Sequence, residues 1–158
     1  MTGKPAFTLV ELVIVLAITC ILSASAFPVM VAAYHKQTLY LAARLLMADI
    51  QEQQQVAVSH PEKVTYQVLL DVQKDCYYLR LGGQQVLRTV RLPSNVDLDE
   101  GSSFGSATND KLLEFKYNGG VQLREAGRVI LRDKDSGQRC YVIVTPFTGR
   151  VRVSTAPP

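Results

Sequence analysis

One glutamate near the N-terminus and two arginines near the C-terminus are the residues of this 158-residue chain whose types and spacing favour chemistry. Glu11 stands at the start of residues 12–33, where no side chain carries a formal charge. That run is long enough to cross a bilayer as a helix. A carboxylate at mid-bilayer costs roughly 2.5–3.5 kcal/mol or more, so an acid placed against such a run predicts a functional role and a partner cation.

A peptidase cut after Ala6 would supply that cation. Phe7 would then carry a free ammonium four residues before Glu11. This separation suits a helical ion pair, within one chain or between neighbouring subunits. The N-terminus of a helix favours the carboxylate as well.

Residues 4–11 carry a family resemblance. Lys-Pro-Ala followed by Phe-Thr-Leu-x-Glu resembles the start of type IV pilins and pseudopilins. The resemblance implies that a prepilin peptidase cuts between Ala6 and Phe7, that Phe7 is N-methylated, and that Glu11 guides docking into a growing filament. A helix-bending proline of the family falls at Pro28, where one backbone donor is removed. The family usually has Gly before the cut, and Ala6 departs from that pattern.

An ordinary secretory signal peptide is the alternative interpretation of the same segment. Residues 24–26 (Ala-Ser-Ala) fit a small-x-small cleavage site, with residues 12–22 as the apolar core. A soluble secreted domain with an unknown binding role would result. Against this, the core begins with Glu11, only Lys4 is basic before it, and the apolar run continues past the site.

After Pro28 the helical spacing persists while polar residues increase. Leu39, Ala43, Leu46 and Ile50 recur at intervals of three or four residues. His60-Pro61 is a natural stop, so one helix is expected over residues 7–59. The expected organisation is a leader peptide (1–6), a transmembrane and assembly helix (7–33), the amphipathic half of the same helix (34–60) and a β-rich globular domain (61–158).

The period changes to two beyond residue 61, which predicts strands. They are expected at residues 64–70, 76–81, 86–92, 112–117, 128–132, 139–145 and 149–153, separated by turn signals such as the Gly82-Gly83 pair. Residues 100–110 are expected to form a mobile loop. The predicted fold class is α+β: a long N-terminal helix, membrane-spanning in its first half, packed on a small antiparallel β-sheet or sandwich. This is the lollipop shape of pilins.

Residues 149–153 (Gly-Arg-Val-Arg-Val) form the sharpest binding motif. In a strand, Val151 would point into the core and Arg150 and Arg152 together toward solvent. Two guanidiniums roughly 6–7 Å apart can bridge phosphates through charge-assisted contacts. Gly149 would let the backbone turn and approach closely. Residues 119–158 are the basic part of a chain whose net charge is +3, and Lys134 and Arg139 could widen the patch.

The C-terminal half carries a second resemblance. Leu113-x-Phe115 with Asn118-Gly119, then 127–131, 141–144 and 148–152, are similar to the minor pseudopilin branch that contains the H-type subunits of type II secretion, FimT-type minor pilins and the competence pseudopilin ComGD. In FimT-type minor pilins a Gly-Arg-x-Arg motif binds DNA, so the resemblance implies a DNA-binding role for Gly149, Arg150 and Arg152. The alternative is that both arginines pack on a neighbouring subunit or stay solvated.

The cysteines leave two alternatives open. Cys20 lies in the membrane segment, and Cys76 and Cys140 lie in strand-like runs of an exported domain, where a disulfide is permitted. Two buried thiols are the other reading. With His35 and His60 as the histidines, no closely spaced metal-ligand set is expected, and no cofactor. Asp97 and Asp99 are expected to solvate an acidic loop. No catalytic constellation is present, so no enzymatic activity is expected.

The function expected is a minor pseudopilin or pilin in a competence system for DNA uptake, with possible contact to double-stranded DNA. The alternative is a purely structural H-type minor pseudopilin of type II secretion. The expected partners are other major and minor pseudopilins, the prepilin peptidase, the inner-membrane assembly platform, and membrane lipid before assembly. The expected location is the cytoplasmic membrane, single-pass with the C-terminal domain outside, and then a cell-surface or periplasmic filament.

Overall fold

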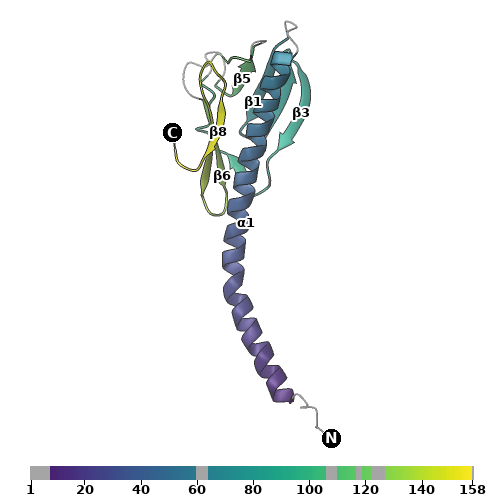
Figure 1. The fold of residues 1–158 in the computed structure, drawn as a ribbon, viewed down its shortest axis with the longest axis vertical. Helices are drawn as coiled ribbons and strands as arrows, with labels where there is room; N and C mark the ends of the chain where they lie inside the picture. Colours follow the sequence, from purple (N-terminus) through teal and green to yellow (C-terminus); the bar gives the residue numbers. More distant parts are fainter. Residues whose placement is uncertain (1–7, 60–63, 106–109, 117–118, 122–126, 158) are drawn as a thin grey trace. The chain divides into compact units, whose positions relative to one another are not determined.

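The protein is described by a computed structural model covering residues 8–59, 64–105, 110–116, 119–121 and 127–157. These residues form one long helix followed by short strands (Figure 1). The elements are α1 (Leu9–Ser59), β1 (Tyr66–Asp71), β2 (Cys76–Leu81), β3 (Gln85–Arg91), β4 (Val96–Leu98), β5 (Leu112–Phe115), β6 (Gly127–Asp133), β7 (Arg139–Val144) and β8 (Val151–Ser154).

The helix predicted from periodicity is present, and it continues through Pro28. Its residues divide between two compact units. One unit ends at Tyr34, and the other begins at His35 and includes the second half of α1 together with every strand named above. The predicted stop at His60-Pro61 lies outside the described residues.

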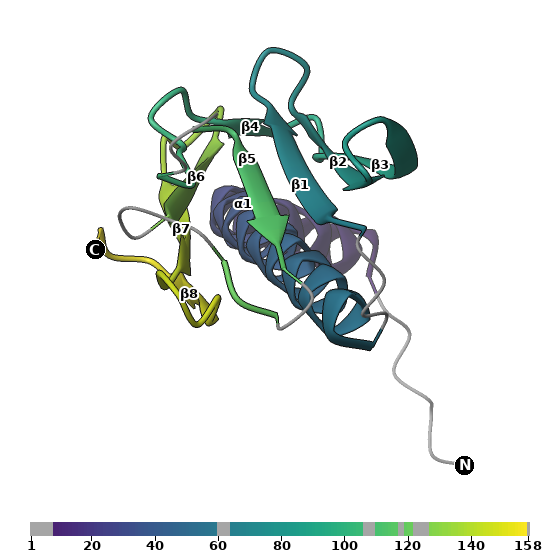
Figure 2. The same cartoon turned by 90° about the horizontal axis from the view of Figure 1, so that it is seen from above.

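The strands form two antiparallel sheets, where the sequence left open a single sheet or a sandwich. The first has the order β3-β2-β1-β5 and the second the order β4-β6-β7-β8. Figure 2 shows β1 and β5 over one side of α1 and the second sheet beside it. The predicted α+β class, a long apolar N-terminal helix followed by antiparallel β-structure, is confirmed.

One hydrophobic core joins the second half of α1 to both sheets. From the helix it takes residues at intervals of three and four, including Leu39, Ala43, Leu46 and Ile50. These side chains are at most 4% exposed. The first sheet contributes Val68 and the second Val142, among others. A spacing of three to four residues places apolar side chains on one face of a helix, which explains why the amphipathic half folds with the strands.

The prediction that Asp97 and Asp99 solvate an acidic loop is wrong. Asp97 lies in β4, a strand of three residues that the sequence did not indicate, and it pairs with Arg132 at 2.7 Å. Asp99 pairs with Arg139 at 3.4 Å. The guanidiniums of Arg132 in β6 and Arg139 in β7 therefore neutralise the two carboxylates.

Residues 102–104, which belong to the loop predicted to be mobile, make buried contacts and hydrogen bonds with β6. Phe104 and Ser102 are completely buried. The Ser102 hydroxyl donates to the Ile130 carbonyl and accepts from the Ile130 N–H. Ser103 exchanges two backbone hydrogen bonds with Arg128, so this part of the predicted mobile loop lies along the edge of β6. Residues 106–109 lie outside the described part of the chain.

Candidate functional site

The start of α1 is capped by the residues of the N-terminal motif. The Glu11 N–H donates to the Thr8 hydroxyl oxygen at 3.2 Å, and the Leu12 N–H donates to the Thr8 carbonyl. Thr8 is thus the N-cap, and Glu11 lies in the first turn, where the helix dipole favours a carboxylate. The predicted cut between Ala6 and Phe7 and the N-methylation of Phe7 lie outside the described residues.

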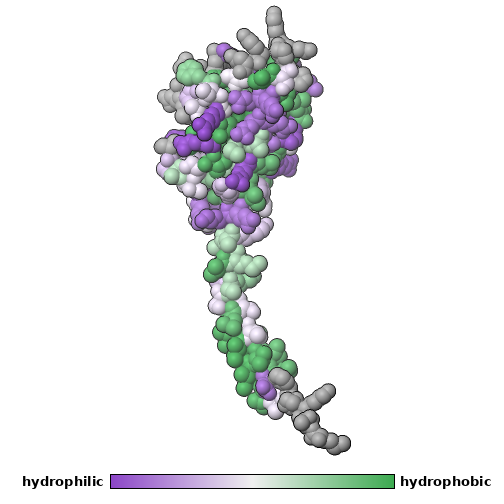
Figure 3. Space-filling view, in the orientation of Figure 1, coloured by the Kyte–Doolittle hydropathy of each residue, from purple (hydrophilic) through white to green (hydrophobic). Residues whose placement is uncertain are grey.

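The first half of α1 is apolar and exposed in the unit to which it belongs. Residues 8–34 are all exposed, and Figure 3 shows mostly apolar colouring along this part of the helix. Two of its hydroxyls are satisfied locally: Thr19 donates to the Leu16 carbonyl and Ser25 to the Leu22 carbonyl. A helix in lipid must satisfy its polar groups internally. By length and composition α1 is suited to crossing a membrane.

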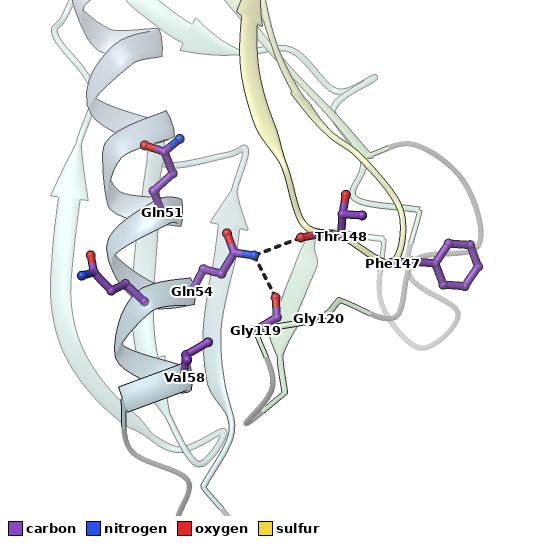
Figure 4. Close-up of a pocket in the computed structure, with 8 residues that line it drawn as sticks. Gln51, Gln54, Val58, Gly119, Gly120, Phe147 and Thr148 are labelled. Carbon is purple, nitrogen blue, oxygen red and sulfur yellow. Dashed lines mark hydrogen bonds between the residues drawn. The ribbon is translucent and has the colours of Figure 1, made fainter.

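The turn before β8 requires glycine at position 149. Gly149 has a φ of +66°, the left-handed region that side chains other than glycine rarely adopt. A Cβ at this position would lie 2.8 Å from the Gln54 side-chain nitrogen. Gln54 donates from that nitrogen to the Gly119 carbonyl at 2.8 Å and to the Thr148 carbonyl at 3.0 Å (Figure 4). One glutamine of α1 therefore ties the loop between β7 and β8 to the loop after β5.

Phe147 and the same glutamine border a surface hollow. Gln51, Gln54, Gln55, Val58, Gly119, Gly120, Phe147 and Thr148 line it. The Phe147 side chain is 79% exposed and turns away from the helix in Figure 4. The lining combines neutral glutamine amides and backbone groups with the apolar side chains of Val58 and Phe147, and Gln54 in it holds the loop that precedes Arg150.

The alternation predicted for the Gly-Arg-Val-Arg motif is present. Val151 is 7% exposed and belongs to the core, while Arg150 and Arg152 are exposed. The strand begins at Val151, two residues later than predicted, because Gly149 has a positive φ and belongs to the turn before the strand. Among the described residues, neither arginine side chain makes a hydrogen bond or an ion pair. Both charges are therefore available to a ligand.

Lys134 and Arg139, which the sequence offered as extensions of the basic patch, are neutralised within the domain. Lys134 pairs with Asp75 at 2.8 Å and Arg139 with Asp99 at 3.4 Å. The sequence could not distinguish them from Arg150 and Arg152, because their partners come from distant segments.

A group of titratable side chains that the sequence did not join forms around Asp133. His35 Nδ1 lies 3.2 Å from the Asp133 carboxylate and 3.3 Å from that of Asp135. Burial by itself raises the pKa of Asp133. Hydrogen bonds from the Ser136 N–H and hydroxyl, His35 and Asn95 outweigh it and hold the pKa at about 2. The expectation that no ligand-type residues cluster is corrected: the fold brings His35, Asp133 and Asp135 together, and their contacts link α1 to the end of β6 and the turn after it.

The disulfide alternative for Cys76 and Cys140 is wrong, since both are buried and free. Cys76 lies in β2 and Cys140 in β7, which belong to different sheets. The Cys140 thiol contacts the Ser154 carbonyl at 3.6 Å, and burial raises its pKa. Each sulfur therefore acts as a small buried apolar side chain.

Residues 1–27 match the prokaryotic N-terminal methylation motif. No curated protein sequence matches the chain.

Two solved structures share the fold. One is the minor pseudopilin EpsH from the Type 2 Secretion System of Vibrio cholerae, with a TM-score of 0.56 and 12% identity over 73% of this chain and 95% of that chain. The other is the type IV minor pilin FimU of Pseudomonas aeruginosa strain PAO1, with a TM-score of 0.56 and 16% identity over 75% of this chain and 90% of that chain. The chain therefore combines a prokaryotic N-terminal methylation motif with a fold that it shares with a minor pseudopilin and a type IV minor pilin.

Proposed function

We propose that the chain is a non-enzymatic filament subunit that enters the cytoplasmic membrane through residues 7–33, with its C-terminal domain outside. A prepilin peptidase cuts between Ala6 and Phe7, and Phe7 is N-methylated. Glu11 and Pro28 then guide packing among other major and minor pseudopilins on an inner-membrane assembly platform. The matched methylation motif and the capped first turn around Glu11 support this proposal. Mass analysis of the mature N-terminus tests it, and a mature chain that starts at residue 27 would contradict it.

Within that class we propose a role in DNA uptake, with duplex DNA bound through the Gly149–Arg152 motif. The supporting observation is that Arg150 and Arg152 are exposed without an ion pair among the described residues, whereas Arg88, Arg132 and Arg139 all pair with carboxylates. A charge that the domain does not neutralise is suited to an external anion, and arginine matches the geometry of phosphate.

A salt series on the full chain in non-ionic detergent tests the DNA role. Each phosphate contact contributes about 0.9 to the slope of log affinity against log salt concentration, so two arginines predict weak binding that falls steeply with salt. Replacing both Arg150 and Arg152 by Ala should abolish binding while circular dichroism stays unchanged, because Val151 still holds the strand. Binding that survives the double substitution would exclude this motif as the DNA site.

A structural subunit of a type II secretion system is the second candidate. The fold has the same TM-score, 0.56, to the secretion pseudopilin as to the type IV minor pilin. In that case the two arginines would contact a neighbouring subunit. Absence of DNA binding at low salt, together with loss of filament incorporation when both arginines are replaced, would favour this candidate.

A further inference from the structure

The outer face of the β4-β6-β7-β8 sheet carries a third exposed arginine beside the two of the Gly-Arg-Val-Arg motif. We propose that Arg128, Arg150 and Arg152 form one site that binds the phosphate backbone of double-stranded DNA. This inference rests on the proposed DNA role. It extends that role to β6, a strand whose sequence shows no DNA-binding motif.

Strand register places Arg128 in the same row as Arg152. Ile143 of β7 pairs with Arg128 on one side and with Arg152 on the other. Residues directly opposite one another point to the same face of a sheet. Two strand spacings put the Cα atoms of the two arginines about 10 Å apart. Arg150 lies just before β8, but its carbonyl accepts from the Thr145 N–H at 2.9 Å, which extends the β7–β8 pairing to this residue. Since it precedes Arg152 by two residues, it points to the same face about 7 Å away.

The neighbouring rows confirm which face this is. Val142 pairs with Val129 on one side and with Val153 on the other, and Val129 and Val142 are fully buried in the core. Side chains one position along each strand must therefore point away from the core. The arginines occupy that outward position.

The backbone of Arg128 is held in place from both sides. Its N–H donates to the Ser103 carbonyl at 2.6 Å, and its carbonyl accepts from the Ser103 N–H at 2.8 Å. On the other side it pairs with Ile143 of β7. The backbone that carries the third arginine is therefore paired on both sides, which fixes its position in the sheet.

Charge divides this face into two ends. At one end Arg132 pairs with Asp97 at 2.7 Å and Arg139 with Asp99 at 3.4 Å. At the other end Arg128, Arg150 and Arg152 are exposed, and their side chains have no hydrogen bond or ion pair among the described residues. An anion is therefore attracted to the end nearest the β7–β8 loop and not to the whole face.

The chemistry of this end favours duplex DNA over single strands. Single-strand sites combine basic residues with aromatic rings on which bases stack. The ring-bearing residue in this face, Tyr141, is 9% exposed, and Ile143 between the arginines is 4% exposed. Neither offers an open platform. Phe147 in the β7–β8 loop is 79% exposed, but one open ring does not make the row of rings on which successive bases stack. Three guanidiniums beside a single ring are suited to phosphates, which duplex DNA presents densely and independently of sequence.

The test measures binding of the full chain, in non-ionic detergent, to a fluorescent duplex of mixed sequence over a salt series. Arg128→Ala should weaken binding several-fold at low salt and lower the salt slope by about 0.9, the contribution of one phosphate contact. Arg91→Ala is the matched control, because it removes the same charge from an exposed position in β3 of the other sheet. It should leave the slope unchanged, and circular dichroism should show both variants folded.

The outcomes separate this inference from the proposed function. If the unmodified chain does not bind duplex at low salt, the DNA role itself fails. If it binds, and loses binding on replacement of Arg150 and Arg152, but Arg128→Ala behaves like Arg91→Ala, the DNA role stands and the three-arginine site is wrong. Tighter binding to a single-stranded oligonucleotide of equal length would overturn the assignment to duplex DNA.

Discussion

Replacing Asp49, a buried charged residue of α1, should strongly destabilise the domain. Asp49 is 4% exposed, and its carboxylate accepts a hydrogen bond from the Tyr77 hydroxyl at 2.6 Å. Arg88 of β3 donates to the other carboxylate oxygen. Burial, and then the hydrogen bond to Asp49, raise the pKa of Tyr77 well above its usual range. This group links α1 to the first sheet across the core.

The magnitude follows from what each group loses. Tyr77 is fully buried, so in Asp49→Ala its hydroxyl has no replacement partner in water. A buried donor left unsatisfied costs about 1–3 kcal/mol, and a hydrogen bond to a charged group contributes about 1.5–3 kcal/mol. Arg88 is about half exposed and also lies 3.5 Å from Glu52, so solvent and Glu52 offset its loss. We expect Asp49→Ala to lower the free energy of unfolding by about 3 kcal/mol.

The assay is urea unfolding of the full chain in non-ionic detergent, followed by far-ultraviolet circular dichroism of the β-structure. With a dependence of about 2 kcal/mol per molar urea, the midpoint should fall by about 1.5 M. Glu52→Ala, on the exposed side of the same helix turn, is the control and should change stability by less than about 0.5 kcal/mol. Tyr77→Phe combined with Asp49→Ala should cost less than the sum of the single changes, by about 1–2 kcal/mol.

Two results would refute this reasoning. The first is a midpoint for Asp49→Ala that equals that of Glu52→Ala, which would mean that the buried pair contributes nothing. The second is strict additivity of Asp49→Ala and Tyr77→Phe, which would mean that the two groups do not interact in the folded protein.

Three further predictions concern other links in the molecule. Gln54→Ala should lower the free energy of unfolding by about 1 kcal/mol and weaken DNA binding, because two carbonyls lose their donor, whereas Gln55→Ala should do neither; equal urea midpoints would contradict this. Asp133, with a pKa lowered from 3.8 to about 2, contributes stability that is complete above pH 3.8 and is lost as pH falls through 2. Urea midpoints measured across this range should fall more steeply for the unmodified chain than for Asp133→Asn. Glu11→Ala should leave the domain folded by circular dichroism but block incorporation into filaments, and normal incorporation would argue against pairing of Glu11 with the mature amino terminus.

The sequence alone was enough for the features that local chemistry controls. The apolar half of α1 follows from the absence of charge in residues 12–33, and the amphipathic half from the spacing of Leu39, Ala43 and Leu46. The inward direction of Val151 and the outward direction of Arg152 follow from strand alternation. The need for Gly149 follows from its place in a turn, where a positive φ excludes a side chain. Each of these depends on residues that are neighbours along the chain.

Tertiary structure alone decided which distant residues meet. Strand order and register place Arg128 beside Arg152, and they give Lys134 and Arg139 their acidic partners. The same packing brings His35 to Asp133 and puts Cys76 and Cys140 in different sheets. Short strands with similar alternation can pair in many orders. Burial of the whole core decides among these orders. No single segment holds enough information to predict that choice.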